Sequence, residues 1–318
     1  MKPAFLLAIP RTLGMLLFGL LLCGMGTASA AVDPALLALM PPDSSFLFGM
    51  QAQNVLASPF GQYAIAQLPV NNGMVMFAAA TGFDYQRDLQ EVVGASNGTG
   101  SRATLALARG SFQPSKFLAL AAVAGATITN YNGTQIFAPP KGATSIAFLD
   151  SSTLAIGSNE ALQAAIDRYA AHKQFSGPLA DKAIAASAAS DAWFATVTPL
   201  SQFLGPKSAA AVPANVLQQV REISAGVRFN DMGMIATGEL TTVSSQQAHM
   251  LQGVLQFLSA MAQSNTLPNP NAVRAAALIS SAQFTVNGTA LDITLPVPEQ
   301  TLEQMYSARK PVKKASLR

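Results

Sequence analysis

The sequence predicts an α+β protein with two similar lobes, each an antiparallel sheet with helices packed on one face. Three observations predict it. Asn-Gly pairs separate β-rich segments, amphipathic helical segments interrupt the strands, and the order of segments repeats roughly 147 residues later, from Phe46 to Trp193. Asn-Gly suits the two positive φ angles of a type I′ turn, which joins antiparallel strands.

Residues 1–30 have the features of an export signal. Lys2 and Arg11 flank the start, an apolar run follows at residues 13–25, and Ala28-Ser29-Ala30 is a small-x-small cleavage site. We expect cleavage after Ala30. An uncleaved membrane anchor is the alternative, although the run is shorter than the roughly 20 residues that span a bilayer.

Cys23 is the only cysteine and lies inside this signal. A lipidated cysteine usually follows Gly, Ala or Ser, whereas Leu22 stands here, so we interpret Cys23 as part of the apolar stretch. The mature chain then has no thiol. Disulfides, thiolate catalysis and cysteine-bound metals are excluded for it.

Charge is sparse and unevenly placed. Only 11% of the residues are charged, and five of the 19 basic residues crowd into residues 309–318. Residues 31–308 carry 12 basic and 16 acidic residues, so there is no dense basic face for nucleic acid. We expect a disordered basic tail, which is either a solvated end or an electrostatic tether to an anionic envelope surface.

Two hairpins are expected around Asn-Gly pairs. Residues 127–131 face 134–137 across Asn132-Gly133, and residues 282–286 face 289–295 across Asn287-Gly288. Both flanks are rich in β-formers. Further strands are expected at residues 46–51, 91–95, 104–109, 145–149, 153–157, 192–198, 224–229 and 234–240.

Four helices are expected between these strands. Residues 54–67 and 114–124 form two of them, and residues 159–170 form a third, with Glu160 and Arg168 placed to match the helix dipole. Ser244 or Ser245 can cap the fourth. Its expected apolar face consists of Leu251, Val254, Leu255, Leu258 and Ala262.

The expected organisation is a signal peptide at 1–30, a first α+β lobe at 31–181, a second at 182–308 and a tail at 309–318. Each lobe opens with a strand and continues with a helix that contains Pro and Gly. The Ala- and Ser-rich stretch at residues 182–190 is the expected seam. This pattern indicates an internal duplication.

One motif suggests nucleophilic catalysis. Gly94-Ala95-Ser96-Asn97-Gly98 fits the Gly-x-Ser-x-Gly elbow of esterases, which needs a strand before the serine and a helix after it. Here a second strand is expected to follow, so a hairpin explains the same residues. A triad also needs a histidine. His172 is expected just past a helix end, where a cation offsets the helix dipole, and His249 is expected on the solvated side of its helix.

The remaining candidates favour structural roles. Asp84, Asp88 and Glu91 could hold Ca²⁺ or Mg²⁺, but Asp84 also suits a helix cap. No phosphate-binding loop is present. Trp193 and the strand phenylalanines at positions 46, 48, 112, 148, 194 and 284 form either core or an apolar pocket. We therefore expect no catalytic, cofactor-binding or metal-binding residues.

A short element carries a family resemblance. Thr81-Gly82-Phe83-Asp84 through Asp88-Leu89, followed by a strand and Gly110-Ser111-Phe112, resembles uncharacterised exported bacterial proteins of acidobacterial type. The match covers residues 42–169, although Ser111 stands where those proteins often have a basic residue. The resemblance implies export and this arrangement of elements, and it implies no activity.

The sequence thus predicts an exported, periplasmic or secreted binding protein of the cell envelope that is not an enzyme. Its ligand would be an apolar small molecule, an envelope polymer or a protein, and not nucleic acid. Two alternatives stay open. One is a secreted serine or metal-dependent hydrolase that acts through Ser96 or the Asp84, Asp88 and Glu91 cluster. The other is a structural subunit of an envelope assembly.

Overall fold

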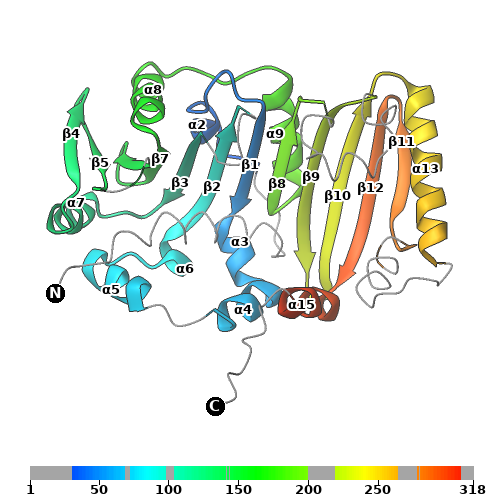
Figure 1. Cartoon of the computed structure of the whole chain (residues 1–318), viewed down its shortest axis with the longest axis horizontal. Helices are drawn as coiled ribbons and strands as arrows, with labels where there is room; N and C mark the ends of the chain where they lie inside the picture. Colours follow the sequence, from blue (N-terminus) through cyan, green and yellow to red (C-terminus); the bar gives the residue numbers. More distant parts are fainter. Residues whose placement is uncertain are drawn as a thin grey trace, which may run out of the picture.

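The described strands lie in one antiparallel sheet. The structure, a computed structural model, describes residues 31–68, 72–97, 104–140, 142, 144–199, 219–263, 278 and 280–308. Within these residues the sheet has 12 strands in the order β11-β12-β10-β9-β8-β1-β2-β3-β7-β6-β5-β4 (Figure 1). The α+β class predicted from the sequence is therefore confirmed.

The strands are β1 (Phe46–Gln51), β2 (Leu89–Ser96), β3 (Leu105–Gly110), β4 (Thr127–Tyr131), β5 (Thr134–Ala138), β6 (Ser145–Phe148), β7 (Thr153–Gly157), β8 (Ala192–Thr196), β9 (Val220–Asn230), β10 (Gly233–Thr242), β11 (Gln283–Asn287) and β12 (Ala290–Pro298). The helices are α2 (Pro34–Leu37), α3 (Ala52–Ala57), α4 (Pro59–Ala66), α5 (Asn72–Thr81), α6 (Tyr85–Asp88), α7 (Pro114–Val123), α8 (Asn159–Ala170), α9 (Pro178–Ala189), α13 (Ser245–Gln263) and α15 (Glu299–Ala308).

The two halves of the chain meet at the pair β1–β8. Phe46 lies opposite Thr196 and Gly49 lies opposite Trp193 in this antiparallel pair. The sequence predicted one sheet for each lobe, whereas β1–β8 pairing joins both sets of strands. The paired residues of β1 and β8 are about 150 positions apart, and no local sequence pattern marks such a pair. Turn signals therefore could not predict that the two sets of strands join edge to edge in one sheet.

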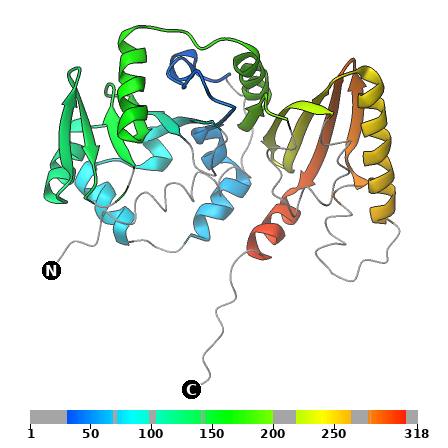
Figure 2. The same ribbon diagram turned by 45° about the horizontal axis from the view of Figure 1, so that its top comes forward.

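Helices cover both faces of the sheet, not one face as predicted. Successive residues of a strand point to opposite faces, and apolar residues of the central strands occupy both. On what we call the α8 face, α2, α8 and α9 pack over Leu47, Val93 and Trp193. On the α4 face, α3, α4 and α15 pack over Met50 and Val92 (Figure 2).

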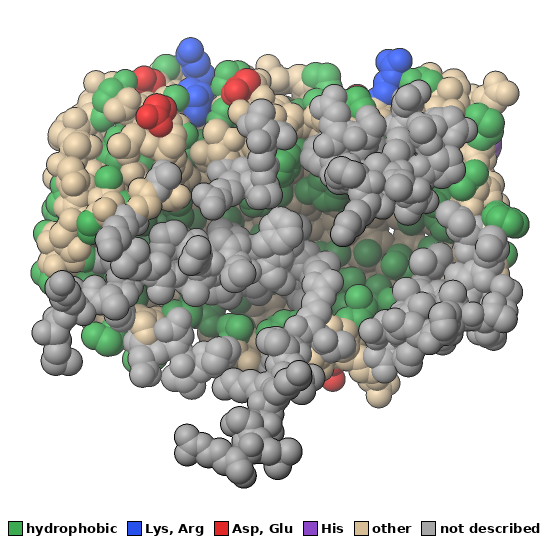
Figure 3. Space-filling model, in the orientation of Figure 1, with side chains coloured by type: hydrophobic (Ala, Val, Ile, Leu, Met, Phe, Trp, Pro, Cys, Tyr) green, Lys and Arg blue, Asp and Glu red, His purple; other side chains and the backbone are tan. Residues whose placement is uncertain are grey.

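The α4 face continues across the second half, where α13 packs over β10, β11 and β12. Figure 3 looks onto this face and shows hydrophobic side chains in a hollow over β9 and β10. Half-buried hydrophobic residues that pack against the buried cluster there are Phe194, Leu240, Leu255, Phe284, Val286 and Ile293. Among the described helices, none is both long and apolar enough for a membrane span.

Most predicted elements are present. The two hairpins form β4–β5 and β11–β12, and β1, β7 and α8 have the predicted boundaries. The Ser244 hydroxyl accepts from the Gln247 amide at 3.4 Å and so caps α13. The helix predicted at 54–67 is two helices, because Ser58 is extended and its hydroxyl caps α4, which begins at Pro59.

Three details differ from the sequence analysis. Asn72-Gly73 opens α5 and not a turn between strands. The predicted seam at 182–190 is largely α9, whose Leu179, Ala180 and Ala183 are buried against β8, β9 and β1. On α13, Leu251 is buried but Val254 is 38% exposed, so the packed face is narrower than predicted. The signal, Cys23 and the basic tail lie outside the described residues.

Candidate anion-binding pocket

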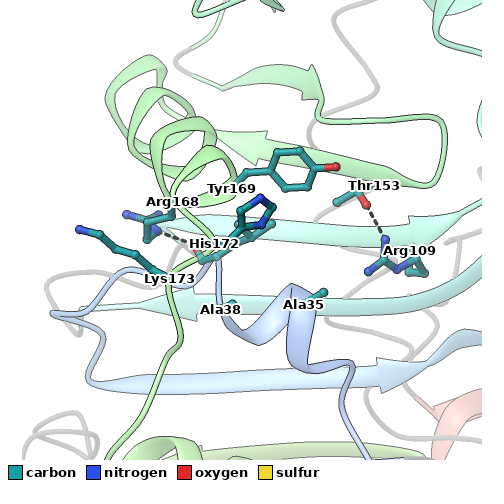
Figure 4. A pocket seen from close by; sticks show the side chains of 9 residues that line it. Ala35, Ala38, Arg109, Thr153, Arg168, Tyr169, His172 and Lys173 are labelled. Carbon is teal, nitrogen blue, oxygen red and sulfur yellow. Dashed lines mark hydrogen bonds between the residues drawn. The ribbon is translucent and has the colours of Figure 1, made fainter.

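A small pocket opens on the α8 face, between α2, the end of α8 and strands β3 and β7 (Figure 4). Its volume is about 200 Å³. The lining residues are Ala35, Ala38, Leu39, Arg109, Thr153, Arg168, Tyr169, His172 and Lys173. Four of these described residues carry basic side chains and none carries a carboxylate, so the lining favours an anion.

The turn that ends α8 supplies three of the basic side chains. The Lys173 amide donates to the Arg168 carbonyl at 3.5 Å, and the His172 amide donates to the Tyr169 carbonyl at 3.4 Å. These two bonds are those of a Schellman motif, in which the residue after the cap is left-handed and usually Gly. Here it is His172, with φ of 48°. Because these backbone amides satisfy the last carbonyls of α8, the side chains of His172 and Lys173 are not needed to cap the helix and can face the pocket.

Arg168 is the most deeply placed cation of this turn. Its Nε donates to the Leu39 carbonyl at 2.9 Å, which ties α8 to the end of α2. Its Nη2 is buried and has no hydrogen-bond partner among the described residues. Burial lowers the pKa of Arg168, and nearby Asp43 and Asp167 act against this effect. An unsatisfied buried N–H carries a desolvation cost.

Arg109 lies at the other end of the pocket and is already paired. Its Nε donates to Asp33 Oδ2 at 2.9 Å, and its Nη2 donates to the same oxygen. Its Nη1 donates to the hydroxyls of Ser152 and Thr153. Asp33 Oδ1 meanwhile accepts from the Ala35 amide and caps α2. Asp33 therefore fixes both Arg109 and the helix that lines the pocket.

A row of polar residues crosses the strands beneath α2. Gln51, Glu91, Arg109 and Thr153 are successive cross-strand neighbours on β1, β2, β3 and β7. Both Glu91 carboxylate oxygens accept from the Asp33 amide at 3.3 Å. Burial raises the pKa of Glu91 to about 7, and the charge of Asp33 adds to this shift while Arg109 opposes it.

Tyr169 and Thr153 are held by one carboxylate outside the lining. The hydroxyl of Tyr169 donates to Asp150 Oδ2 at 2.8 Å, and Thr153 donates to the same oxygen at 3.1 Å. Asp150 Oδ1 accepts from the amide and hydroxyl of Ser152. These hydrogen bonds lower the pKa of Asp150 although burial acts to raise it. The hydroxyls of the pocket are thus fixed in orientation.

The structure does not place Ser96 in a nucleophile elbow. Ser96 ends β2, is 1% exposed and is followed along the sheet by the antiparallel β3. A Cβ on Gly94 would lie 2.2 Å from Phe48 Cζ, so this glycine makes room for a ring. His172 belongs to the pocket turn on the α8 face, whereas the Ser96 side chain shares the α4 face with its neighbour Phe46.

The three acidic candidates do not converge on one site, although the Asp84 amide donates to Asp88 Oδ2 at 2.8 Å. Asp84 Oδ1 accepts from the Gln86 amide and caps α6, and Asp88 pairs with Arg87 at 2.6 Å. Glu91 lies under α2 on the α8 face. No group of three or more metal-ligating residues is found in the described part of the chain. Of these three residues, only Glu91 lies near the pocket.

The aromatic residues divide between core and half-buried positions. Trp193, Phe112 and Phe148 are at most 9% exposed and belong to the core. Phe194 and Phe284 are half-buried on the α4 face, and Phe46 and Phe48 are half-buried in β1. His249 lies on α13, away from the pocket.

The sequence pattern does not reveal the pocket as a site. It indicates Arg168 and His172 only as partners of the helix dipole, and it gives no signal for Lys173. A histidine at the left-handed position after α8 was the available local signal. Arg109 and α2 are about 60 and 130 residues away in the sequence, and only the fold brings them together.

The fold and the pocket together define a class: an α+β protein with one extended antiparallel sheet and a cationic pocket on the α8 face. No protein-family model matches the chain, and no curated protein matches its sequence. Among solved structures, crystal form III of a protein named TP0453 has a TM-score of 0.52 at 11% identity, over 87% of this chain and 99% of that chain. Crystal form IV of TP0453 has a TM-score of 0.50 at 12% identity, over 89% and 98%. At this identity the likeness concerns the fold alone.

Proposed function

We propose that the chain is an exported binding protein of the cell envelope that takes a small anion in the α2–α8 pocket and does not catalyse a reaction. The observation that carries the proposal is the lining itself: Arg168, His172, Lys173 and Arg109 surround one cavity, and no carboxylate is among its lining residues. The predicted leader at residues 1–30 and the resemblance to exported bacterial proteins support the location.

The chemistry of the lining favours binding over catalysis. Tyr169 and Thr153 are engaged with Asp150, and Arg109 is engaged with Asp33. A nucleophile needs a base within hydrogen-bond reach, and no hydroxyl of the described residues forms a hydrogen bond with His172. The arrangement instead supplies fixed donors around a cavity, which suits recognition.

Calorimetric titration of the purified full chain with acetate, phosphate and sulfate tests the proposal. We expect binding of at least one anion, and Lys173→Met should weaken it about ten-fold, since a hydrogen bond to a charged group contributes about 1.5–3 kcal/mol. Arg168→Met should weaken it further. Arg221→Met is the matched control, because Arg221 is exposed on β9, far from the pocket. Equal affinities in all four proteins would refute the assignment.

An apolar ligand on the α4 face is the second candidate. It is favoured by the hydrophobic hollow in Figure 3 and by half-buried Phe194, Leu240 and Phe284 at that face. Native mass spectrometry of protein from the native host, before and after organic extraction, tests it. A releasable adduct supports the apolar ligand, and an unchanged polypeptide mass removes this candidate.

Three further features belong to the proposal. The halves are two copies of one unit. Outward from the centre, three strands (β1-β2-β3 and β8-β9-β10) and an edge hairpin (β5-β4 and β12-β11) follow the same order in each half, whereas β7 and β6 have no counterpart among the described strands of the second half. The basic tail at 309–318 contacts an anionic envelope surface. Envelope protein partners, as for a structural subunit, would appear as co-purifying polypeptides in the same mass spectrum.

A further inference from the structure

The pocket has two chemically different ends, and the following inference rests on the proposed function. Figure 4 shows Arg168 and Lys173 on one side, Arg109 and Thr153 on the other, and His172 between them. The short side chains of Ala35 and Ala38 on α2 border the space. The two ends differ in how much of their positive charge is already matched.

The Arg168 end has more positive charge than the Arg109 end, because Lys173 adds to Arg168 in the lining, although Asp43 and Asp167 lie near Arg168. One Arg168 donor is used by the Leu39 carbonyl, while Nη2 is buried without a partner among the described residues. Lys173 and His172 are exposed beside it. Asp167, a carboxylate on the same helix, is held by Tyr131 and Asn132 at 2.9 Å each. A carboxylate bound at this end would lie beside Lys173 and the Arg168 guanidinium and would pair with their positive charge.

The Arg109 end has no spare positive charge. Asp33 matches Arg109 directly, and Asp150 lies behind Thr153 and Tyr169. A second anionic group bound here would meet two carboxylates and one cation. Hydroxyl groups of a ligand could instead accept from the remaining Arg109 donor and donate to the oxygens of Thr153 and Tyr169. The charge of Arg109 is already matched by Asp33, and the two hydroxyl oxygens are uncharged.

We propose that the pocket selects a small polyhydroxylated monocarboxylate, with its carboxylate at Arg168 and Lys173 and its hydroxyls toward Arg109, Thr153 and Tyr169. The same molecule with a second carboxylate at its far end is disfavoured by Asp33 and Asp150. The same carbon chain without hydroxyls leaves the polar end unpaired. The class is that of sugar acids with one negative charge.

Calorimetry on the full chain with three six-carbon probes tests this selection. Gluconate has one carboxylate and hydroxyls, glucarate has two carboxylates and hydroxyls, and hexanoate has one carboxylate and no hydroxyls. We expect gluconate to bind about ten-fold more tightly than either of the others, the ratio that one unsatisfied polar group typically produces. Glucarate or hexanoate binding as tightly as gluconate would overturn the inference.

Variants distinguish the two ends. Asp33→Asn keeps an N-cap residue for α2 but removes the charge next to Arg109, so glucarate should gain affinity relative to gluconate. Tyr169→Phe should reduce the preference for gluconate over hexanoate and leave hexanoate binding unchanged. Arg221→Met is again the control. If Asp33→Asn leaves the ratio of the glucarate and gluconate affinities unchanged, the charge of Asp33 does not exclude the second carboxylate and the inference fails.

The outcomes also separate this inference from the proposed function. If acetate and all three probes bind with similar affinities and Lys173→Met weakens all of them, the pocket binds anions and only the selection is wrong. If none of the anions binds, the proposed function fails as well.

Discussion

The backbone amide of Asp33 donates to both carboxylate oxygens of Glu91, at 3.3 Å each. Glu91 is 5% exposed, and this contact joins the first residues of the described chain to the middle of the sheet. Asp33 in turn holds Arg109. A buried carboxyl group is thus connected to the pocket through one residue, which makes the stability of this region sensitive to pH.

Glu91→Gln should remove this pH dependence. The pKa of Glu91 is about 7 in the folded chain, against 4.5 ordinarily, so the folded state retains a proton that the unfolded state has lost. This stabilisation is fully present below about pH 4.5 and is lost as the pH rises through 7. As the pH rises from about 4 to about 8, the free energy of unfolding of the variant should increase relative to that of the unmodified chain by up to about 3 kcal/mol.

Urea unfolding at both pH values measures this difference, and a glutamine oxygen keeps an acceptor for the Asp33 amide. The Glu303→Gln variant is a control, since Glu303 is only half-buried and lies on α15, on the opposite face of the sheet from Glu91. The prediction is contradicted if the difference in the free energy of unfolding between Glu91→Gln and the unmodified chain does not increase with pH.

His172→Gly should stabilise the fold and weaken anion binding. The residue has φ of 48°, a conformation that glycine adopts without the steric cost that an L side chain meets. We expect a gain of about 1 kcal/mol in the free energy of unfolding. If the imidazole contributes to the pocket, affinity for the anion falls at the same time. A stabilised variant with unchanged affinity would show that His172 serves only the turn.

Gly49→Ala should be strongly destabilising. A Cβ at this position would lie 2.6 Å from Trp193 Cζ2, and Trp193 is 1% exposed and surrounded by core. Overpacking of this kind costs about 1–3 kcal/mol. Gly253→Ala on α13 is the matched control, because nothing lies within 4 Å of the added methyl group, and it should gain about 1 kcal/mol from helix propensity. Thermal unfolding of both variants measures the contrast.

Ser96→Ala should leave any hydrolysis of model esters unchanged. The residue is buried at the end of β2, so the change should cost about 1 kcal/mol of stability through a lost hydrogen bond. Assays with short-chain nitrophenyl esters, alongside circular dichroism, measure both effects. Loss of ester turnover in a folded variant would instead favour the serine hydrolase.

Local signals in the sequence predict much of this fold. Asn132-Gly133 marks a hairpin because both residues have positive φ, which few other residue pairs adopt. At the second hairpin only Gly288 of the Asn-Gly pair has positive φ, and the turn lies between the paired residues Asn287 and Ala290. The Ser158 hydroxyl caps α8 where the helix was expected to begin. At Asn72-Gly73 the same dipeptide opens a helix, so an Asn-Gly pair alone does not specify a turn between strands.

Long-range relationships are the part that sequence patterns do not contain. The continuous apolar run of β1 indicates two buried faces, but not that Gly49 will lie opposite Trp193. The pocket is a similar case. Arg168 and Lys173 are neighbours in one turn, whereas their partners Arg109 and Ala38 come from a strand and a helix that the sheet brings beside them.

The pairing of β1 with β8 also sets the order in which the sheet can be completed. As the chain emerges, β1 can pair with β2 after some 40 residues, but its other edge stays open until residues 192–196 arrive. β1 reads Phe-Leu-Phe-Gly-Met-Gln, apolar and uncharged, the kind of open edge that recruits foreign strands. A chain cut after residue 181 would keep that edge permanently. Such a fragment would be a nucleus for aggregation, and the intact chain would depend most on a chaperone during that interval.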